Sequence, residues 1–359
     1  MSIKRITLKG TKYEMGFQYG AVLQAELKTS LGIIKEFFIG KHHFSNDALL
    51  NKTNAFYERY PSSFQDFIKG VANGADLTLG DAKILNGMET LNSLIANRSE
   101  ISACAFVAIP PFKTGDSVII GRNYDFPAPF SKLAKYLLIT ILLEENAIPT
   151  AFIGMPGQIY CSTCINQNSL FVEFNNATPS GGKAVNQERE SLLISLLSTL
   201  QSSRNLLELD SKLQQLESDY SLVVNVADKK YVRAYEYSSY YGMKSFTPEE
   251  NSVYASTNFY LNKTWNRSVI SDENTWYGVT RMNNLLNLAK TAVSVSDVMN
   301  MLDRKLSDGG ATWNLTIYQI IYDAGAYNLH IKRTLEDEEW ECIDMHELFA
   351  DVPLHTQEL

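Results

Sequence analysis

One cysteine and two charged residues suggest chemistry in this chain. The stretch SACAFVAI contains Cys104, and the next apolar run ends in GRNYDF, which brings Arg122 and Asp125. A hairpin centred near residues 113 and 114 would place position 104 opposite position 123, and strict alternation would point Arg122 and Asp125 to opposite faces of their strand. A cysteine attacks a carbonyl carbon as its thiolate, a form that a neighbouring guanidinium favours. These residue types predict a nucleophilic cysteine. The alternative is that Cys104 is a small apolar residue of a buried strand.

A catalytic cysteine needs a base, and histidine is the usual one. The region from residue 44 to residue 329 contains no histidine, because the chain carries only His42, His43, His330, His346 and His355. A papain-like pair is therefore disfavoured. If the bond between Ala103 and Cys104 were cut, the α-amino group of Cys104, with an ordinary pKa of about 7.7 to 8.0, would itself be a base suited to neutral pH. Asp125 would then orient the new ammonium group.

The same residues resemble a known family. Cys104 followed by Gly121–Phe126 is similar to the opening of the cysteine N-terminal nucleophile hydrolases, the linear amide C–N hydrolase or choloylglycine hydrolase superfamily. The segment before the cysteine most resembles the isopenicillin N acyltransferase-like branch (acyl-CoA:6-aminopenicillanic acid acyltransferase). The resemblance implies autoproteolysis between Ala103 and Cys104, with Cys104 as nucleophile, Arg122 beside its sulfur, and Asp125 on the freed amine.

Three later segments extend the resemblance. Asn166–Leu170 and the following FVEFNNA match a family element that carries an oxyanion-hole asparagine, which places Asn176, or its neighbour Asn175, in that role. The family's "TN" turn and helix start imply supporting roles for Asn258 and Arg281. The chain departs from the family pattern at three places, which are Ala103 before the cysteine, Ala105 and Phe106 after it, and Ser169 at a turn glycine.

The order of periodic segments predicts an α+β fold. Residues 1–103 are expected to be mostly helical, and strand-like runs fill most of 101–177. Further patterns predict helices between residues 188 and 218, 280–290 and 294–306, and hairpins over 220–239 and 316–333. Ser294 or Ser296 is expected to cap the last of these helices. The resemblance implies a four-layer αββα sandwich of two antiparallel sheets. We expect a helical pro-segment, 1–103, packed as one unit with a catalytic domain, 104–359.

Composition excludes several other classes. The 359 residues carry a formal net charge of −8 and no basic run, which argues against nucleic-acid partners. The N-terminus has no secretory or targeting pattern, and no apolar run is long enough to span a membrane, so a cytoplasmic location is expected. No phosphate loop or histidine cluster predicts a cofactor or metal, and the oligomeric state is left open. The spacing of Cys161 and Cys164 is that of a redox or zinc pair, but it lies in a strand-like setting.

The expected substrate is a small linear, non-peptide amide with an apolar acyl group. Tyr124, Phe126, Phe130 and Phe174, with Asn175, are candidates to line the acyl pocket, although aromatic residues on strands are more often plain core. Three functions remain in competition: a self-processing amide hydrolase, an acyltransferase that passes the acyl group to an amine, and a catalytically silent, unprocessed binding protein.

Overall fold

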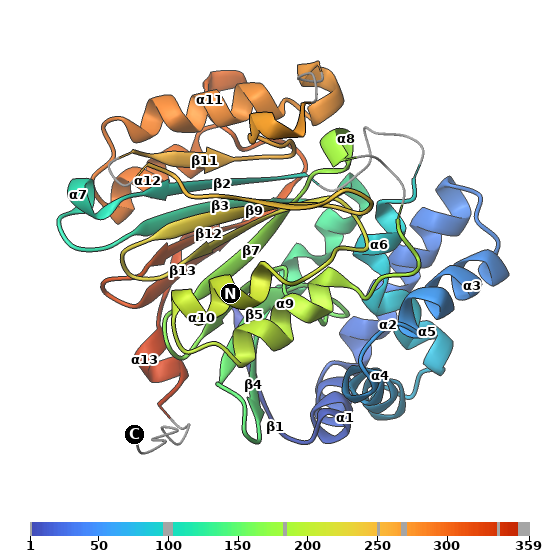
Figure 1. Cartoon of the computed structure of the whole chain (residues 1–359). Helices are drawn as coiled ribbons and strands as arrows, with labels where there is room; N and C mark the ends of the chain where they lie inside the picture. Colours follow the sequence, from blue (N-terminus) through green and yellow to red (C-terminus); the bar gives the residue numbers. More distant parts are fainter. Residues whose placement is uncertain are drawn as a thin grey trace.

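The chain folds around two β-sheets that face each other, with helices on both outer faces (Figure 1). This arrangement confirms the expected four-layer αββα sandwich. The structure is a computed structural model and describes residues 2–95, 103–181, 185–249, 252–266, 271–335 and 338–350.

The first sheet has six antiparallel strands and carries Cys104. In spatial order they are β11 (Tyr254–Ser256), β2 (Ala103–Ile109), β3 (Ile119–Asp125), β12 (Thr316–Asp323), β13 (Asn328–Arg333) and β14 (Glu341–Asp344). Cys104 pairs with Tyr124, so the expected pairing with Asn123 was wrong by one residue. The reason is the connection between β2 and β3, which is the helical turn α7 (Pro111–Thr114) closed by Gly115 in the left-handed conformation, not a tight hairpin turn.

The second sheet has eight strands. In order they are β1 (Lys4–Gly10), β4 (Leu138–Glu144), β5 (Thr150–Gly154), β6 (Thr163–Asn166), β7 (Phe171–Asn176), β8 (Leu222–Ala227), β9 (Val232–Ser238) and β10 (Gly242–Phe246). All neighbours are antiparallel except β1 and β4, which are parallel. The segment before Cys104 therefore supplies an edge strand to this sheet as well as helices.

Helices form the two outer layers. On the six-stranded sheet lie α11 (Gly278–Ala289) and α12 (Val295–Asp303), and Ser294 caps α12 by accepting a hydrogen bond from the Asp297 N–H, as expected for one of its candidate caps. On the eight-stranded sheet lie α9 (Leu192–Gln201) and α10 (Leu206–Leu213). Short helical turns connect the strands: α8 (Thr178–Gly181), η3 (Ala128–Tyr136), η4 (Lys263–Trp265), η5 (Asp272–Thr275), η6 (Leu306–Asp308) and α13 (Met345–Leu348).

The N-terminal helices gather beside the sandwich (Figure 1). They are α1 (Lys12–Val22), α2 (Gln24–Lys35), the π-helix η1 (Glu36–Lys41), α3 (Asn46–Tyr57), α4 (Ser62–Gly74), α5 (Leu79–Asn86) and α6 (Met88–Asn92). They confirm the mostly helical character expected before Cys104. Within the described ranges, every helix is too short or too polar to cross a bilayer.

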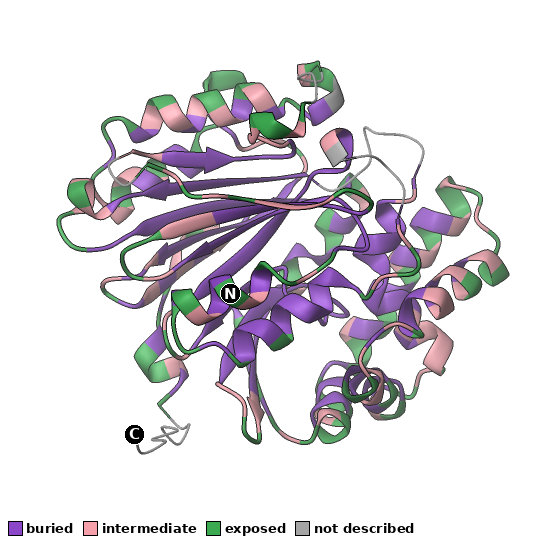
Figure 2. Ribbon diagram, in the orientation of Figure 1, coloured by how far each residue is buried: buried purple, intermediate pink, exposed green. Residues whose placement is uncertain are grey.

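The strands that carry the candidate site are buried along their whole length. Figure 2 shows the interior strands in the colour of buried residues, and every residue of β2, β3 and β7 is buried. Because side chains alternate along a strand, Cys104 and Phe106 face the opposite sheet, whereas Ala105 and Val107 pack under α11 and α12. The fold thus places the Cys104 sulfur between the two sheets.

Candidate active site

The Cys104 side chain is enclosed and lies beside a cation. It is 1% exposed, and Nη2 of Arg122 lies 3.5 Å from its sulfur. Arg122 pairs with Phe106, two pairs further along the hairpin, and so lies on the same face of the sheet as Cys104. Burial raises the pKa of the Cys104 thiol to about 12, although the Arg122 charge pulls the pKa down. In the uncut chain the thiol therefore keeps its proton at neutral pH.

The Arg122 guanidinium is held by four groups of the opposite sheet. Its Nη1 donates to the Ser162 carbonyl and the Thr163 hydroxyl, and its Nη2 donates to the Phe174 carbonyl at 2.9 Å. Its Nε lies 3.2 Å from Oε2 of Glu173, and both side chains are fully buried. Burial alone would lower the pKa of Arg122, but Glu173, Cys104 and Tyr318 together more than offset this, so the pKa is raised. The guanidinium is thus charged and fixed in one orientation.

Asp125 lies on the other face of its strand, as strict alternation requires. Its Oδ2 accepts from Arg281 Nη1 at 2.5 Å and from Trp313 Nε1 at 2.9 Å, and its Oδ1 accepts from the Thr316 hydroxyl at 2.7 Å. Burial raises the pKa of Asp125, while Arg281 and the two other donors pull the pKa back down. β3 ends at Asp125 without turning this side chain toward the sulfur. The candidate site therefore occupies both faces of the strand, with Arg122 on one face and Asp125 on the other.

Asn258 and Arg281 contact the main chain of Cys104. The Cys104 N–H donates to Oδ1 of Asn258 at 3.2 Å, and Nη2 of Arg281 donates to the Cys104 carbonyl at 3.2 Å. Arg281 also donates to Asn258 Oδ1 at 2.6 Å. Arg281 stands in the first turn of α11, where its Nε donates to the Trp276 carbonyl. The nitrogen that cleavage would convert to an amine is therefore already met by a buried side-chain oxygen.

The two candidate oxyanion-hole asparagines point in different directions. Nδ2 of Asn176 donates to the hydroxyl of Ser93, which belongs to the segment before Cys104, at 3.3 Å. The Asn176 carbonyl accepts from Asn258 Nδ2 at 2.8 Å, which ties this strand end to the site. Nδ2 of Asn175 donates to Ser256 on the facing sheet at 3.1 Å. In the uncut chain both amides have partners, so the assignment to Asn176 stays a prediction.

Two of the departures from the family pattern have a structural setting. Ser169, where the family has a glycine, has a φ of 65°. That left-handed conformation is one that glycine adopts without strain. Ala103 is fully buried and packs against Trp276 and Trp313, so the residue before the cysteine has little space for a larger side chain.

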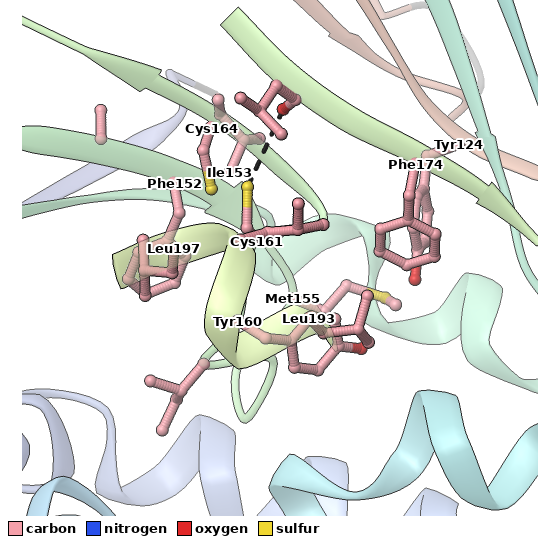
Figure 3. Close-up of a cluster of buried hydrophobic side chains, with 14 of the residues drawn as sticks. Tyr124, Phe152, Ile153, Met155, Tyr160, Cys161, Cys164, Phe174, Leu193 and Leu197 are labelled. Atoms are coloured by element: carbon pink, nitrogen blue, oxygen red, sulfur yellow. Dashed lines mark hydrogen bonds between the residues drawn. The ribbon is translucent and has the colours of Figure 1, made fainter. Parts of the chain in front are cut away.

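The aromatic residues expected to line a pocket pack against one another. Tyr124 stacks on Phe126 at a centroid distance of 5.9 Å, and Phe126 meets the edge of Phe130 at 4.7 Å; all three are fully buried. Tyr124 and Phe174 are both labelled in Figure 3, and the Arg122 guanidinium lies over each of the two rings. The Tyr124 hydroxyl donates to Glu89 at 3.0 Å. In the uncut chain these rings form core contacts, and their part in acyl binding stays a prediction.

The CxxC pair has a structural position that the sequence did not suggest. Cys161 and Cys164 are both buried thiols near α9, and Cys161 lies before β6 instead of inside a strand (Figure 3). The two residues between them, Ser162 and Thr163, are the ones that accept from Arg122. A search of the described residues finds no group of three or more His, Cys, Asp or Glu that could hold a metal ion.

The histidines of the described ranges make their contacts elsewhere. His42 packs against Phe37, His330 lies near Cys342, and His346 packs against Tyr327, while His43 is exposed. His355 lies outside the described residues. Sequence reasoning missed Glu173, for which the one available signal was an acidic residue inside the otherwise apolar strand pattern FVEF.

The raised thiol pKa leads to a prediction for alkylation. In the uncut chain at pH 8, iodoacetamide should modify the exposed Cys342 and spare Cys104, because Cys104 is buried and ionises only as the pH approaches about 12. Peptide mapping by mass spectrometry after timed labelling measures both sites in one sample. Labelling of Cys104 as fast as Cys342 would contradict the enclosed, protonated thiol.

Comparisons with known proteins give the following findings. No family model matches the sequence. Among solved structures, the chain is similar to an orthologue of N-acylethanolamine-hydrolyzing acid amidase from Caenorhabditis elegans, with 13% identity, a TM-score of 0.46, and coverage of 62% of this chain and 93% of that one. A mutant of conjugated bile acid hydrolase from Clostridium perfringens is 10% identical with a TM-score of 0.48, and the match covers 68% of this chain and 93% of that one. Penicillin V acylase from Agrobacterium tumefaciens is 10% identical with a TM-score of 0.43, and the match covers 68% of this chain and 86% of that one.

Proposed function

We propose that this chain is a self-processing cysteine amidohydrolase of the N-terminal nucleophile type. One observation carries the proposal: two atoms of the same residue meet separate buried polar groups. The Cys104 sulfur meets Arg122, and the Cys104 nitrogen meets Asn258, which is itself bonded to Arg281. A cysteine that served only as core would need a partner for its buried main-chain N–H but no guanidinium at its sulfur.

The first step is cleavage of the chain. The Cys104 sulfur attacks the Ala103 carbonyl, the carbon–nitrogen bond breaks, and the proton of the thiol passes to the departing nitrogen. Water then hydrolyses the resulting thioester, which leaves a carboxylate on Ala103 and a free α-amine and thiol on Cys104. In this proposal the uncut chain, with its buried Cys104 sulfur, is the precursor. Asn258 and Asp125 would then orient the new ammonium group.

The same atoms would then act on a small amide. The α-amine takes the thiol proton, the sulfur attacks the amide carbon, and the α-amine returns the proton to the leaving nitrogen. Asn176 Nδ2, released from Ser93, would stabilise the oxyanion together with a main-chain N–H. Water then attacks the thioester and releases the acid together with the free thiol. In the acyltransferase alternative an amine attacks instead and carries away the acyl group. The proposed substrates are linear, non-peptide amides with an apolar acyl group.

Intact mass and product analysis test the proposal. We expect two pieces, residues 1–103 and 104–359, and an acyl adduct on Cys104 during turnover of a panel of fatty-acyl, aryl-acyl and steroid-acyl amides. Adding an amine acceptor separates the two enzyme alternatives, because an acyltransferase forms more new amide than free acid. A chain that stays at its full mass and never acylates Cys104 would refute the proposal and leave the silent binding protein.

The oxyanion-hole assignment gives a graded prediction. Asn176→Ala should lower kcat by about 10²- to 10³-fold with detectable residual activity, because one donor to the developing charge is lost. Asn175→Ala is the matched control, since Asn175 is the next residue on β7, equally buried, and its amide points to Ser256. Steady-state kinetics on cleaved protein measures both. A larger loss for Asn175→Ala than for Asn176→Ala would reverse the assignment.

A further inference from the structure

A buried carboxylate lies next to the candidate site, and the mechanism above does not use it. Glu173 stands in the middle of β7, paired with Thr163 on β6 and Asn225 on β8, and it is fully buried. Its side chain reaches toward the facing sheet, where Oε2 lies 3.2 Å from Nε of Arg122. An ionisable group in the interior of a β-sandwich costs folding free energy unless it is paired. Its presence there calls for a role.

Neighbouring side chains hold Glu173 in place. Oε1 of Glu173 accepts a hydrogen bond from Asn225 Nδ2. The Asn225 Oδ1 in turn accepts from the hydroxyls of Tyr254 and Ser256, each at 3.1 Å, on β11 of the other sheet. The carboxylate is therefore fixed from behind by a hydrogen-bonded chain that bridges the two sheets. Its free side faces Arg122.

We propose that Glu173 is a positioning residue that aims the Arg122 guanidinium at the Cys104 sulfur; this inference rests on the proposed function. Three of the groups that bind Arg122 are neutral, and Glu173 is the ionisable one among the described contacts. Burial raises the pKa of Glu173 to about 7, although Arg122 and the Asn225 hydrogen bond pull the pKa down, so the carboxylate is charged above that pH. With its Nε turned to Glu173, the guanidinium directs Nη2 toward the sulfur.

The charge of Glu173 has a second consequence. The Cys104 thiolate is favoured by Arg122 and disfavoured by Glu173, so the carboxylate partly cancels the effect of the cation. A thiol that stays protonated until the α-amine takes its proton matches the proposed mechanism, in which that amine must receive a proton and return it. Glu173 therefore makes two separate contributions: it orients the Arg122 guanidinium, and its charge raises the thiol pKa of Cys104. Different variants of Glu173 change each contribution.

Two substitutions separate these contributions. Glu173→Gln removes the charge and keeps the size, so the thiol pKa of Cys104 should fall by about one pH unit. Because an amide holds the guanidinium less firmly, kcat should fall by about 10- to 100-fold with KM unchanged. Glu173→Asp keeps the charge but withdraws it from Arg122 by one methylene, so kcat should fall by a similar factor while the thiol pKa stays at the wild-type value.

The thiol pKa is obtained from the rate of Cys104 alkylation as a function of pH, with the modified peptide quantified by mass spectrometry. The kcat of each variant is divided by the fraction of protein molecules in which Cys104 can be acylated. The titratable and charged groups that face the Arg122–Glu173 pair are the same in every variant: Cys104 on β2, Tyr124 on β3, Cys164 on β6, Tyr254 on β11 and Tyr318 on β12. Glu236→Gln is the matched control, since Glu236 is a 2% exposed carboxylate on β9 of the same sheet whose partners are Leu261, Asn262 and Trp265. It should leave both readouts unchanged.

Glu173→Gln with wild-type kcat and thiol pKa would overturn the inference. A loss of activity that is fully explained by a smaller amount of folded protein, with kcat per folded molecule and the thiol pKa unchanged, would overturn it as well, because a purely structural residue would give that result. If Glu173→Gln fails to fold, Glu173→Asp decides: normal kcat per folded molecule overturns the inference, and reduced kcat at an unchanged thiol pKa supports it. Alkylation needs no amide substrate. If the wild-type chain never cleaves or acylates, the proposed function is refuted, and prolonged labelling of the uncut chain at rising alkaline pH still tests Glu173, because Cys104 of Glu173→Gln should then be modified faster than Cys104 of the wild type.

Discussion

Cys104→Ala should leave the chain at its full 359 residues and abolish amide turnover. Both steps use the same sulfur as the attacking atom, so no residual route through the thioester remains. Intact-mass measurement after purification and again after prolonged incubation follows the cleavage, and product analysis follows turnover. The expected result is one species of full mass and a rate equal to that without protein.

The matched control for this variant is Cys164→Ala. Cys164 is a second fully buried cysteine, in β6 of the opposite sheet, and its side chain makes none of the contacts of the scissile bond. Its loss should leave cleavage intact and change stability by about 1 kcal/mol, the scale of a small core truncation. Cleavage that persists in Cys104→Ala, or stops in Cys164→Ala, would show that Cys104 is not the nucleophile.

Asp125→Asn should lower the free energy of unfolding by about 3 to 5 kcal/mol and prevent cleavage. Arg281 and Asp125 are both fully buried, and the substitution leaves the guanidinium without its carboxylate in a medium of low polarity. Arg281 also holds Asn258 and the Cys104 carbonyl, so a shift of its side chain disturbs both sides of the main chain at Cys104. Urea unfolding and intact mass measure the two effects.

Asp303→Asn provides the comparison for an exposed ion pair. Asp303 pairs with Lys332 at 2.8 Å, but the two side chains are 39% and 20% exposed, so water replaces much of the lost interaction. The expected change in the free energy of unfolding is about 0 to 1 kcal/mol. Equal losses for Asp125→Asn and Asp303→Asn would mean that the buried pair is not the element that stabilises the site.

Most of the secondary structure followed from local patterns. Helices α11 and α12 and the hairpin of β12 and β13 have strong apolar periodicity, and the structure contains them at the expected places. The strand β10 was not predicted, because its residues are half-exposed and lack a buried face that would leave an alternating pattern. Helix α3 was missed as well; its residues are mixed in polarity and pack against other N-terminal helices.

The candidate site was predicted in part. The resemblance named Cys104, Arg122, Asp125, Asn258 and Arg281, and the structure brings all five together through contacts of side chain or main chain. The pairing of the β2–β3 hairpin was wrong by one residue, because the shape of its connection depends on a helical turn and a left-handed glycine. The role of residues 1–103 as a removable pro-segment stays a prediction, which the intact-mass experiment tests.

The sequence by itself determined which residue types could do chemistry here and, through strand alternation, that Arg122 and Asp125 lie on opposite faces. Only the tertiary structure decided that Glu173 lies against Arg122, and that Asn258 and Arg281, more than 150 residues from Cys104 along the chain, meet its nitrogen and its carbonyl oxygen. The physical reason is that alternation is a local property of one strand. The packing of the two sheets against each other and the position of α11 depend instead on burial of apolar surface across the whole domain.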